Sequence, residues 1–294
     1  MKCGTVTIMG RPNVGKSTLL NTLLNIKLAI TTDKAGTTRN VIEGIYQDED
    51  SQIVFIDTPG VHKPTHKLGN ILNKKAYQNI DNADIILLLI DAEKGIGKGD
   101  QFIVNKIKEN KDAIVFLILN KIDRISKEKL MEMIHQAQDL YPFAEFIPMS
   151  ALKGTGKEEL LKTLKQDLPT QEPIFSEEEL TNVSTRFIMA EFVREKAMML
   201  TRQEIPHAIT CYVEQYEEKE NVVHIQVLIV VDRDNIKKIL IGKNGQMLKK
   251  IGTLARADME QFLGKKVFLE TYVKTIRNWR DQEKYLIELG LQDE

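Results

Sequence analysis

The chain has 294 residues, of which 42% are hydrophobic and 28% charged, so it can form two folded domains with buried cores. No apolar run approaches the roughly 18 to 20 residues of a membrane-spanning helix, and the only two cysteines, Cys3 and Cys211, exclude a disulfide framework and a zinc-ligand cluster. This cysteine usage favours a reducing cytoplasm, and the formal net charge of -1 gives no sign of a polyanionic partner for the chain as a whole.

The first 165 or so residues alternate short apolar runs with amphipathic stretches. Such alternation is typical of a mostly parallel sheet with helices on both faces, and it predicts an α/β domain. We expect strands at residues 5–9, 53–56, 85–90, 114–119 and 143–147, and helices that include residues 16–24, 101–109 and 127–139.

A phosphate-binding loop is expected where the first strand gives way to the first helix. The string Gly10-Arg-Pro-Asn-Val-Gly-Lys-Ser17 matches the Walker A pattern in its proper strand-to-helix context. Its glycines let backbone N–H groups converge on phosphate oxygens, while Lys16 can contact the β and γ phosphates and Ser17 can bind Mg²⁺. The nucleotide-binding residues expected here are Gly10, Asn13, Val14, Gly15, Lys16, Ser17 and Thr18.

Two further strings are expected to complete the metal and γ-phosphate site. Asp57-Thr-Pro-Gly60 follows the strand at 53–56, so Asp57 can hold Mg²⁺ through water and the Gly60 N–H can sense the γ phosphate. Gly36-Thr-Thr-Arg39 lies after the first helix, where either Thr37 or Thr38 could complete the Mg²⁺ shell, and the sequence leaves that choice open. We expect Ser17, Thr38 and Asp57 as metal ligands, Lys16, Thr38 and Gly60 as catalytic groups, and Thr37 as a further nucleotide contact.

The strings after the later strands point to guanine. Asn120-Lys-Ile-Asp123 follows the strand at 114–119, and Asp123 there can accept from N1–H and N2–H₂, a donor pair that adenine lacks. Asn120 can pair with the guanine edge, the Lys121 stem can cover the ring, and the Ala151 N–H is expected near guanine O6. The expected base contacts are Asn120, Lys121, Asp123, Ser150, Ala151 and Leu152, and the five strings together resemble the translation-factor-like branch of GTPases.

Val61 departs from the pattern of many GTPases, which carry a water-orienting glutamine after the equivalent of Gly60. Because valine can neither donate nor accept a hydrogen bond, we expect slow intrinsic turnover that a partner or RNA raises. The segment 61–73 has the composition of a mobile switch. His62 and His66 have the spacing of a zinc-binding helix, but Pro64 between them favours a solvated loop.

The pattern changes after Pro169 and Pro173, which mark a linker. A long helical stretch from residue 177 to about 201 is followed by strand, strand, helix, loop, helix and strand. We therefore expect a P-loop NTPase domain at residues 1–168, a linker at 169–178 and an α+β domain at 179–294.

The string Gly242-Lys-Asn-Gly245 joins two predicted helices and has the G-x-x-G form of a KH domain, which clamps about four nucleotides of RNA backbone. Residues 232–280 carry 12 Lys or Arg against 5 Asp or Glu, a net charge of +7 that suits a polyanion. The expected RNA contacts are Ile241, Gly242, Lys243, Asn244, Gly245, Lys249 and Arg256, with Lys265, Lys266, Lys274, Arg277 and Arg280 as further candidates; Trp279 is expected to pack.

A P-loop GTPase domain followed by one type II KH domain closely resembles the Era family of bacterial GTPases. The likeness covers essentially the whole chain and is most specific at the strings quoted above. It implies Mg²⁺-dependent hydrolysis of GTP to GDP and phosphate, binding to 16S rRNA, and a role in 16S rRNA processing and assembly of the small (30S) ribosomal subunit. It also implies peripheral contact with the inner face of the cell membrane. We further expect a monomeric cytoplasmic protein.

Two alternatives remain open at this point. One is a GTPase related to tRNA modification, which would need a catalytic cysteine or a one-carbon cofactor site, and Cys211 within a predicted strand supports this poorly. The other is a signalling switch whose basic C-terminal domain binds protein or membrane lipid. For the favoured interpretation we expect a switch in which GTP orders residues 37–38 and 57–73, so that GTP and RNA favour each other's binding.

Overall fold

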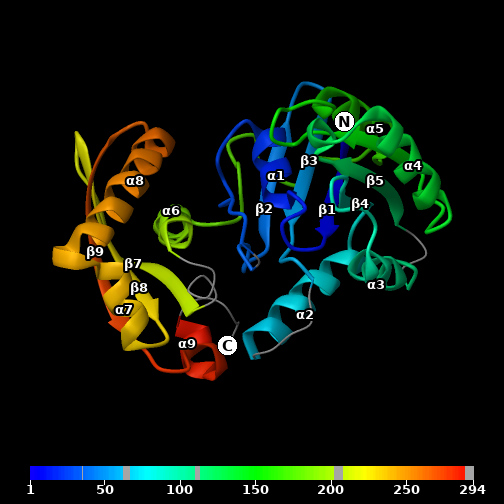
Figure 1. The fold of residues 1–294 in the computed structure, drawn as a ribbon. Coiled ribbons are helices and arrows are strands. Elements are labelled where there is room, and N and C mark those ends of the chain that lie inside the picture. The colour runs from blue at the N-terminus through cyan, green and yellow to red at the C-terminus, as the bar shows by residue number, and fades with distance from the viewer. Residues whose placement is uncertain (35, 62–66, 110–112, 202–207, 289–294) are drawn as a thin grey trace. The chain divides into compact units, whose positions relative to one another are not determined.

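The computed structural model describes residues 1–294 except residues 35, 62–66, 110–112, 202–207 and 289–294 (Figure 1). The chain divides into two compact units. The first comprises Met1–Leu28, Thr38–Lys63 and Leu72–Asn182, and the second comprises Ala29–Thr37, Pro64–Ile71 and Val183–Glu294. The segment directly before Thr38 therefore folds with the C-terminal part of the chain.

The first unit is built on a six-stranded sheet in the order β2-β3-β1-β4-β5-β6. All neighbours pair in parallel except β2 and β3, which are antiparallel, so the carboxyl ends of β1 and β3 to β6 meet at one edge. The strands are β1 (Lys2–Gly10), β2 (Ile42–Gln47), β3 (Ser51–Asp57), β4 (Ile85–Asp91), β5 (Ile114–Asn120) and β6 (Glu145–Met149).

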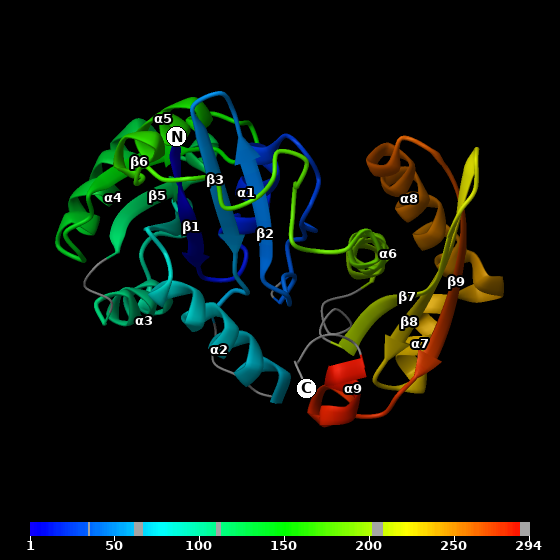
Figure 2. The same ribbon diagram turned by 180° about the vertical axis from the view of Figure 1, so that it is seen from behind.

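Helices cover both faces of this sheet (Figures 1 and 2). A continuous apolar core joins one face to α2, α3 and α4, with Ala76, Ile103 and Met133 among the buried side chains. The opposite face is covered by α1 and α5. The helices are α1 (Lys16–Leu24), α2 (Lys67–Asp81), α3 (Lys98–Ile107), α4 (Lys127–Gln138) and α5 (Lys157–Asp167), with a short 3₁₀ turn η1 (Ile122–Arg124).

The second unit contains a three-stranded sheet in the order β7-β8-β9. The strand β8 pairs antiparallel with β7 and parallel with β9, so the chain crosses over between β8 and β9 through two helices, as in a type II KH domain. The elements are α6 (Thr185–Leu200), β7 (Ile209–Glu218), β8 (Val222–Val231), α7 (Asp234–Ile241), η3 (Lys243–Gly245), α8 (Gln246–Leu263), β9 (Lys266–Thr275), η4 (Trp279–Asp281) and α9 (Glu283–Glu288).

The predicted fold class, an α/β P-loop domain followed by an α+β KH domain, is confirmed. The strand β2 was not predicted, because its short apolar pattern is interrupted by Gly44, whose missing side chain makes room for Leu20 and Leu24. The segment 61–73, which we expected to be a mobile switch, is helical from Lys67, where α2 begins. His62, Pro64 and His66 lie outside the described residues.

Trp279 packs as expected. Its side chain is fully buried, and the indole N–H donates to the Ala208 carbonyl at 3.2 Å. Among the helices that the structure describes, none is both long and apolar enough to cross a bilayer.

Candidate nucleotide-binding site

The phosphate loop turns between the end of β1 and the start of α1 through left-handed backbone positions. Asn13 and Gly15 have φ angles of 65° and 105°. At Gly15 a side chain is also excluded sterically, because a Cβ there would lie 2.2 Å from Nδ2 of Asn120. Glycine at this position therefore permits both the loop conformation and the approach of β5.

Lys16, the first residue of α1, folds its side chain back over this loop. It is only 6% exposed, and its ammonium donates to the carbonyls of Gly10 and Arg11, each at 3.1 Å. Burial lowers the pKa of Lys16 to about 8, against the opposing attraction of Asp57. A buried cation in this position is suited to bind phosphate oxygens, whose negative charge would offset the burial.

Three oxygen-bearing side chains converge beside Lys16. The Ser17 hydroxyl lies 2.6 Å from Oδ2 of Asp57 and 2.8 Å from the Thr38 hydroxyl, which is 3.4 Å from the same Asp57 oxygen. Burial raises the pKa of Asp57 to about 6, although Lys16 and the two hydroxyls oppose the shift. The other carboxylate oxygen, Oδ1, is buried and has no hydrogen-bond partner in the described part of the chain.

This donor set fits Mg²⁺, which prefers hydroxyl, carboxylate and water oxygens. An orphaned buried carboxylate oxygen is costly unless a cation or an ordered water meets it. The Thr37 hydroxyl is engaged elsewhere, 2.7 Å from the Thr32 hydroxyl and 2.7 Å from the Lys34 carbonyl. The geometry therefore favours Thr38 over Thr37 as the threonine of the metal site.

Asn120, at the end of β5, ties two neighbouring loops together. Its Nδ2 donates to the Val14 carbonyl at 2.7 Å, and its Oδ1 accepts from the Ala151 N–H at 2.9 Å. We expected the Asn120 amide and the Ala151 N–H to contact guanine. Instead the amide pairs with the Val14 carbonyl and the Ala151 N–H, which are buried backbone groups that would otherwise lack partners. One N–H of the Asn120 amide remains for a base.

Lys121 lies beside the phosphate loop, and Asp123 lies beside the segment after β6. The Lys121 ammonium donates to the Asn13 carbonyl at 2.8 Å and to Asp91 at 2.6 Å. A hydrogen bond from Ser150 lowers the pKa of Asp123, with burial opposing it and nearby Lys153 lowering it further. Asp123 is thus an ionised acceptor, as guanine recognition requires.

Asp91 was missed by the sequence reasoning. It ends β4, is 1% exposed, and binds the Lys121 ammonium. Burial would raise its pKa, but the Lys121 ammonium and the N–H groups of Glu93 and Lys94 hold that pKa below its usual range. Its position after an apolar strand is the signal that could have found it.

The remaining predicted residues divide between buried and exposed positions. Val14 and Ser150 are buried, whereas the Leu152 side chain is 75% exposed, as expected of a side chain available to a ligand. Gly60 lies against Pro12 of the phosphate loop, to which a Cβ at Gly60 would approach within 3.0 Å. Val61 is buried in the apolar core. This packing explains why an apolar residue, which cannot orient water, occupies the position.

A second missed feature is the anchoring of Arg11. Its Nε donates to Oδ1 of Asp100 at 2.9 Å, and its Nη2 donates to the Gly95 carbonyl at 2.9 Å. Asp100 is fully buried in the first turn of α3, and a Cβ at Gly99 would lie 2.7 Å from Arg11 Cδ. The glycines around residues 95–99 were the available signal, since they leave room for this arginine.

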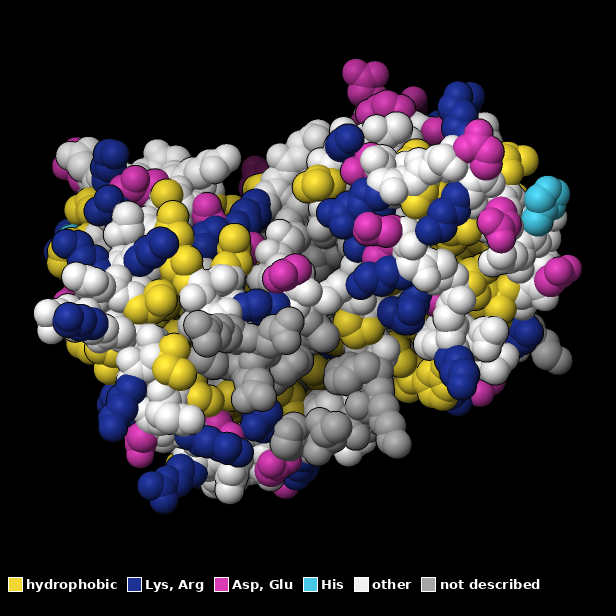
Figure 3. All heavy atoms as spheres, in the orientation of Figure 1, with side chains coloured by type: hydrophobic (Ala, Val, Ile, Leu, Met, Phe, Trp, Pro, Cys, Tyr) yellow, Lys and Arg dark blue, Asp and Glu magenta, His cyan; other side chains and the backbone are white. Residues whose placement is uncertain are grey.

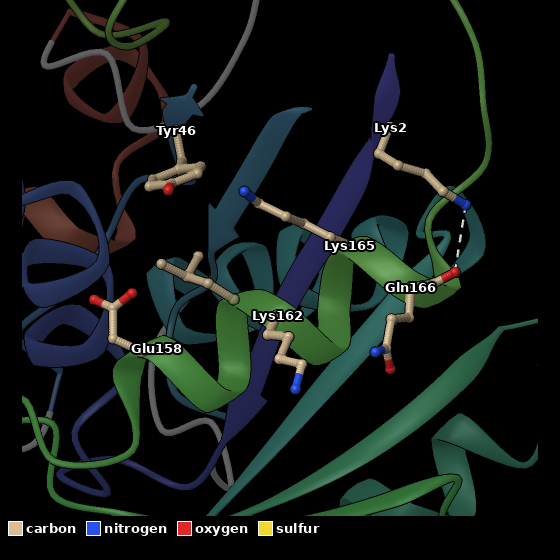
Figure 4. A pocket seen from close by; sticks show the side chains of 7 residues that line it. Lys2, Tyr46, Glu158, Lys162, Lys165 and Gln166 are labelled. Carbon is tan, nitrogen blue, oxygen red and sulfur yellow. Dashed lines mark hydrogen bonds between the residues drawn. The ribbon is translucent and has the colours of Figure 1, made fainter. Parts of the chain in front are cut away.

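A hollow of about 500 Å³ lies at the opposite edge of the sheet, near the start of β1 (Figure 4). The Lys2 ammonium in its wall donates to the carbonyls of Gln166 and Leu168. Lys165 pairs with Asp48, which also accepts from the Tyr46 hydroxyl. The hollow is not part of the nucleotide site, because it lies at the start of β1, whereas the phosphate loop follows the end of that strand.

In the second unit, the predicted clamp joins α7 to α8. Gly242 and Gly245 have φ angles of 71° and 75°, and a Cβ at Gly242 would lie 3.0 Å from the backbone nitrogen of Met247. Asn244 between them is also left-handed, with φ 52°. The loop requires its glycines, and Lys243 between them is exposed.

The basic residues of this unit fall into two groups. Lys243, Lys249 and Arg256 are exposed and have no carboxylate partner among the residues that the structure describes. Most of the further candidates instead have acidic partners: Lys265 with Glu218, Lys266 with Glu260, Arg277 with Asp234, and Arg280 with Asp232. Figure 3 shows Lys and Arg side chains spread over the visible face of this unit.

Comparison with known proteins finds a GTPase domain and a KH domain in this chain. A family model described as 50S ribosome-binding GTPase matches residues 5–121, and a KH domain model matches residues 204–280. The GTPase Era of Leuconostoc citreum (strain KM20) is 45% identical over 295 residues, covering 100% of this chain and 97% of that protein.

Two solved structures are similar over 99% of both chains, each with 42% identity and a TM-score of 0.95. One is a variant of Aquifex aeolicus Era bound to GDP and AlF4⁻. The other is Era in complex with MgGDPNP and nucleotides 1506–1542 of 16S ribosomal RNA. With the phosphate loop, the guanine-recognition strings and the G-x-x-G clamp in one chain, this full-length similarity shows that the chain is a GTPase and belongs to the Era family.

Proposed function

We propose that this protein is a GTP-controlled switch that binds 16S rRNA through its KH domain during 16S rRNA processing and assembly of the small (30S) ribosomal subunit. The observation that carries the proposal is one chain that holds a guanine-type P-loop site and an exposed, basic G-x-x-G clamp. The Era relative solved with MgGDPNP and a 16S rRNA fragment supports the same pairing of ligands.

In this proposal GTP lies with its phosphates on the loop of residues 10–18. Lys16 and the loop N–H groups bind the β and γ phosphates, Asp123 selects guanine, and Leu152 covers the base. Ser17, Thr38 and Asp57 would hold Mg²⁺, which when bound neutralises charge on the β and γ phosphate oxygens.

Hydrolysis transfers the γ phosphoryl group to water. A water oxygen bonds to the γ phosphorus while the bond to the bridging oxygen breaks, giving GDP, phosphate and a proton. Since Val61 is buried in the core, the proposed groups at the γ phosphate are Thr38 and the Gly60 N–H. We therefore propose a slow intrinsic rate that an RNA or ribosomal partner raises.

The RNA contacts we propose are the Gly242–Gly245 loop with Ile241, and the Lys249 and Arg256 side chains of α8. The glycines allow close approach of the RNA backbone. Lys243, Lys249 and Arg256, which meet no carboxylate in the described part of the chain, can bind phosphates. We further propose a GTP-binding domain at residues 1–168, a linker at 169–178 and a KH domain at 179–294.

We also propose that the protein acts as a cytoplasmic monomer with peripheral contact to the inner face of the cell membrane. Membership of the Era family is what supports this proposal. Cell fractionation with and without high salt tests it: release of the protein from membranes by salt is expected, and its absence from the membrane fraction at low salt would exclude the contact.

The test of RNA binding compares two charge reversals of the same size. Lys243→Glu in the clamp should weaken binding to a 3′-terminal 16S rRNA fragment at fixed salt by at least about tenfold. Lys127→Glu, on α4 of the first unit, should bind RNA as the wild type does. Both variants should hydrolyse GTP at the wild-type rate, and unchanged RNA affinity in Lys243→Glu would contradict the proposal.

The alternatives have weaker support. Cys211 is buried in β7 and 9% exposed, and no group of three or more His, Cys, Asp or Glu residues suited to a metal occurs in the described part of the chain. A lipid-binding role for the basic unit would be favoured if Lys243→Glu weakened binding to anionic vesicles but left binding to rRNA unchanged.

A further inference from the structure

The segment that precedes Thr38 is fixed to α6 of the second unit. The Thr31 N–H donates to Oε1 of Glu195 at 2.9 Å, and the Lys34 ammonium donates to the carbonyls of Met198 and Thr201 at the end of the helix. Ala29–Thr37 accordingly belongs to this unit rather than to the nucleotide-binding one.

Arg194 binds the last residue of this segment, Thr37. Its Nη2 donates to the Thr37 carbonyl, while Nε and Nη2 bind the two carboxylate oxygens of Glu191 at 2.6 and 2.5 Å. The Arg194 side chain is 1% exposed. A guanidinium held at two atoms by one carboxylate has little freedom, so the donor that reaches Thr37 is preset.

The Thr37 carbonyl is part of the peptide group whose nitrogen belongs to Thr38. Fixing that carbonyl fixes the plane of the peptide and so restricts the backbone from which the Thr38 hydroxyl projects. That hydroxyl lies 2.8 Å from Ser17 and 3.4 Å from Asp57. Thr38 thus lies beside the other two side chains of the proposed metal site.

Burying an ion pair such as Arg194–Glu191 stabilises a fold poorly, because the desolvation of both charges offsets their attraction. A hydrophobic pair of similar size would serve packing as well. What the pair supplies and a hydrophobic pair does not is a directed donor to one carbonyl, at the residue next to the metal site.

We propose that Arg194 is a positioning residue for GTP hydrolysis: it holds the Thr37–Thr38 peptide so that Thr38 reaches the metal and the γ phosphate. This inference rests on the proposed metal site. Arg194 acts through Thr38 and touches no reacting atom, and it lies on α6, so a residue of the RNA-binding unit supports the nucleotide chemistry. GDP, which lacks a γ phosphate, should depend on it little.

The test uses Arg194→Met and the double variant Glu191→Met/Arg194→Met, which removes both buried charges and so avoids an unpaired one. Arg186→Met is the matched control, since it makes the same change at an exposed position of α6 where the guanidinium lies over Tyr216. The readouts are affinity for GDP and for a non-hydrolysable GTP analogue with Mg²⁺, single-turnover hydrolysis, and thermal unfolding.

We expect the double variant to unfold near the wild-type temperature and to bind GDP normally. It should bind the analogue about tenfold more weakly and hydrolyse GTP at least about tenfold more slowly, with a higher Mg²⁺ requirement. Arg194→Lys, which keeps a cation and a donor, should recover part of the loss.

Unchanged discrimination between analogue and GDP, together with an unchanged rate, would overturn the inference. So would an equal fall in both affinities that follows the loss of thermal stability, because that is the result of a structural role alone. If instead the wild type fails to hydrolyse GTP with Mg²⁺, the proposed function itself fails, and the two failures are distinguishable.

Discussion

Gly15 shows how a single position can be required by two separate constraints. Its φ of 105° disfavours any side chain, and its α-carbon faces Nδ2 of Asn120, which a Cβ would approach to 2.2 Å. The second constraint links the phosphate loop to the segment after β6, because Asn120 also accepts from the Ala151 N–H.

Gly15→Ala should therefore weaken GTP and GDP binding by at least about tenfold, or more than about 1.4 kcal/mol, by displacing Asn120. Gly264→Ala is the control, since Gly264 has a φ of 64° but open space around it. The control should lose about 1 kcal/mol of stability, because alanine is disfavoured at a left-handed φ, and should keep its nucleotide affinity. Isothermal titration and urea unfolding measure both effects, and equal nucleotide affinity in the two variants would show that the contact with Asn120 is unimportant.

Because the Asp100 carboxyl is buried, the stability of the folded chain should depend on pH. Burial raises the pKa of Asp100, against the N–H of Gly97 and the charge of Arg11. The folded state therefore binds a proton more tightly than the unfolded chain, and its stability should fall as the pH rises from about 3.8 through the raised pKa.

Asp100→Asn removes this titration. The unfolding free energy of the wild type, relative to that of the variant, should thus fall as the pH rises from about 3.8 through the raised pKa of Asp100, measured by urea unfolding at each pH. A difference that moves in favour of the wild type over that range would mean that the Arg11 ion pair outweighs the burial.

At the scale of elements, the phosphate loop and the G-x-x-G loop share one feature: a helix begins directly after each. The helix α1 starts at Lys16 and α8 starts at Gln246, each with a left-handed glycine as its N-cap. Both helices thereby present unsatisfied backbone N–H groups close to an expected phosphate, one of a nucleotide and one of RNA.

Trp279 begins the 3₁₀ turn η4 after β9, and its side chain is buried in the second unit. Trp279→Phe keeps most of the apolar area but leaves the Ala208 carbonyl without its 3.2 Å donor, so a loss of about 1–3 kcal/mol is expected from urea unfolding. Nucleotide affinity should not change. A loss below about 0.5 kcal/mol would indicate that water replaces the indole N–H.

For the whole molecule, GTP and RNA raise each other's affinity for the chain only if both ligands prefer the same arrangement. Linkage then requires reciprocity: the factor by which the GTP analogue, relative to GDP, raises RNA affinity must equal the factor by which RNA raises analogue affinity relative to GDP.

We expect this factor to lie between about 5 and 150, the usual range of such couplings. The test needs the dissociation constant of RNA with each nucleotide bound and that of each nucleotide with and without RNA. All are measured at one salt concentration, because RNA affinity depends steeply on salt. A factor of one would show that nucleotide state and RNA binding are independent. The Arg194→Met variant should reduce the factor, whereas Arg186→Met should not.

Local patterns in the sequence were enough to predict the α/β and KH fold, the phosphate loop, guanine specificity and the G-x-x-G clamp. Each of these depends on a short string beside a strand or helix end, so residue type and backbone conformation suffice to recognise it. The strands were predicted wherever apolar runs were long, and β2 was missed where the run was short and broken by Gly44.

The contacts that hold the site together became evident only from the folded chain. The structure favours Thr38 over Thr37, and it pairs Lys121 with Asp91, Arg11 with Asp100 and Arg194 with Thr37, which are 30, 89 and 157 positions apart, respectively. One sequence does not show which distant charges meet, because any lysine or arginine can pair with many carboxylates or carbonyls. Packing of the strands and helices brings particular partners together and buries them. Burial then holds each pair together, because a buried polar group that lost its partner would be costly.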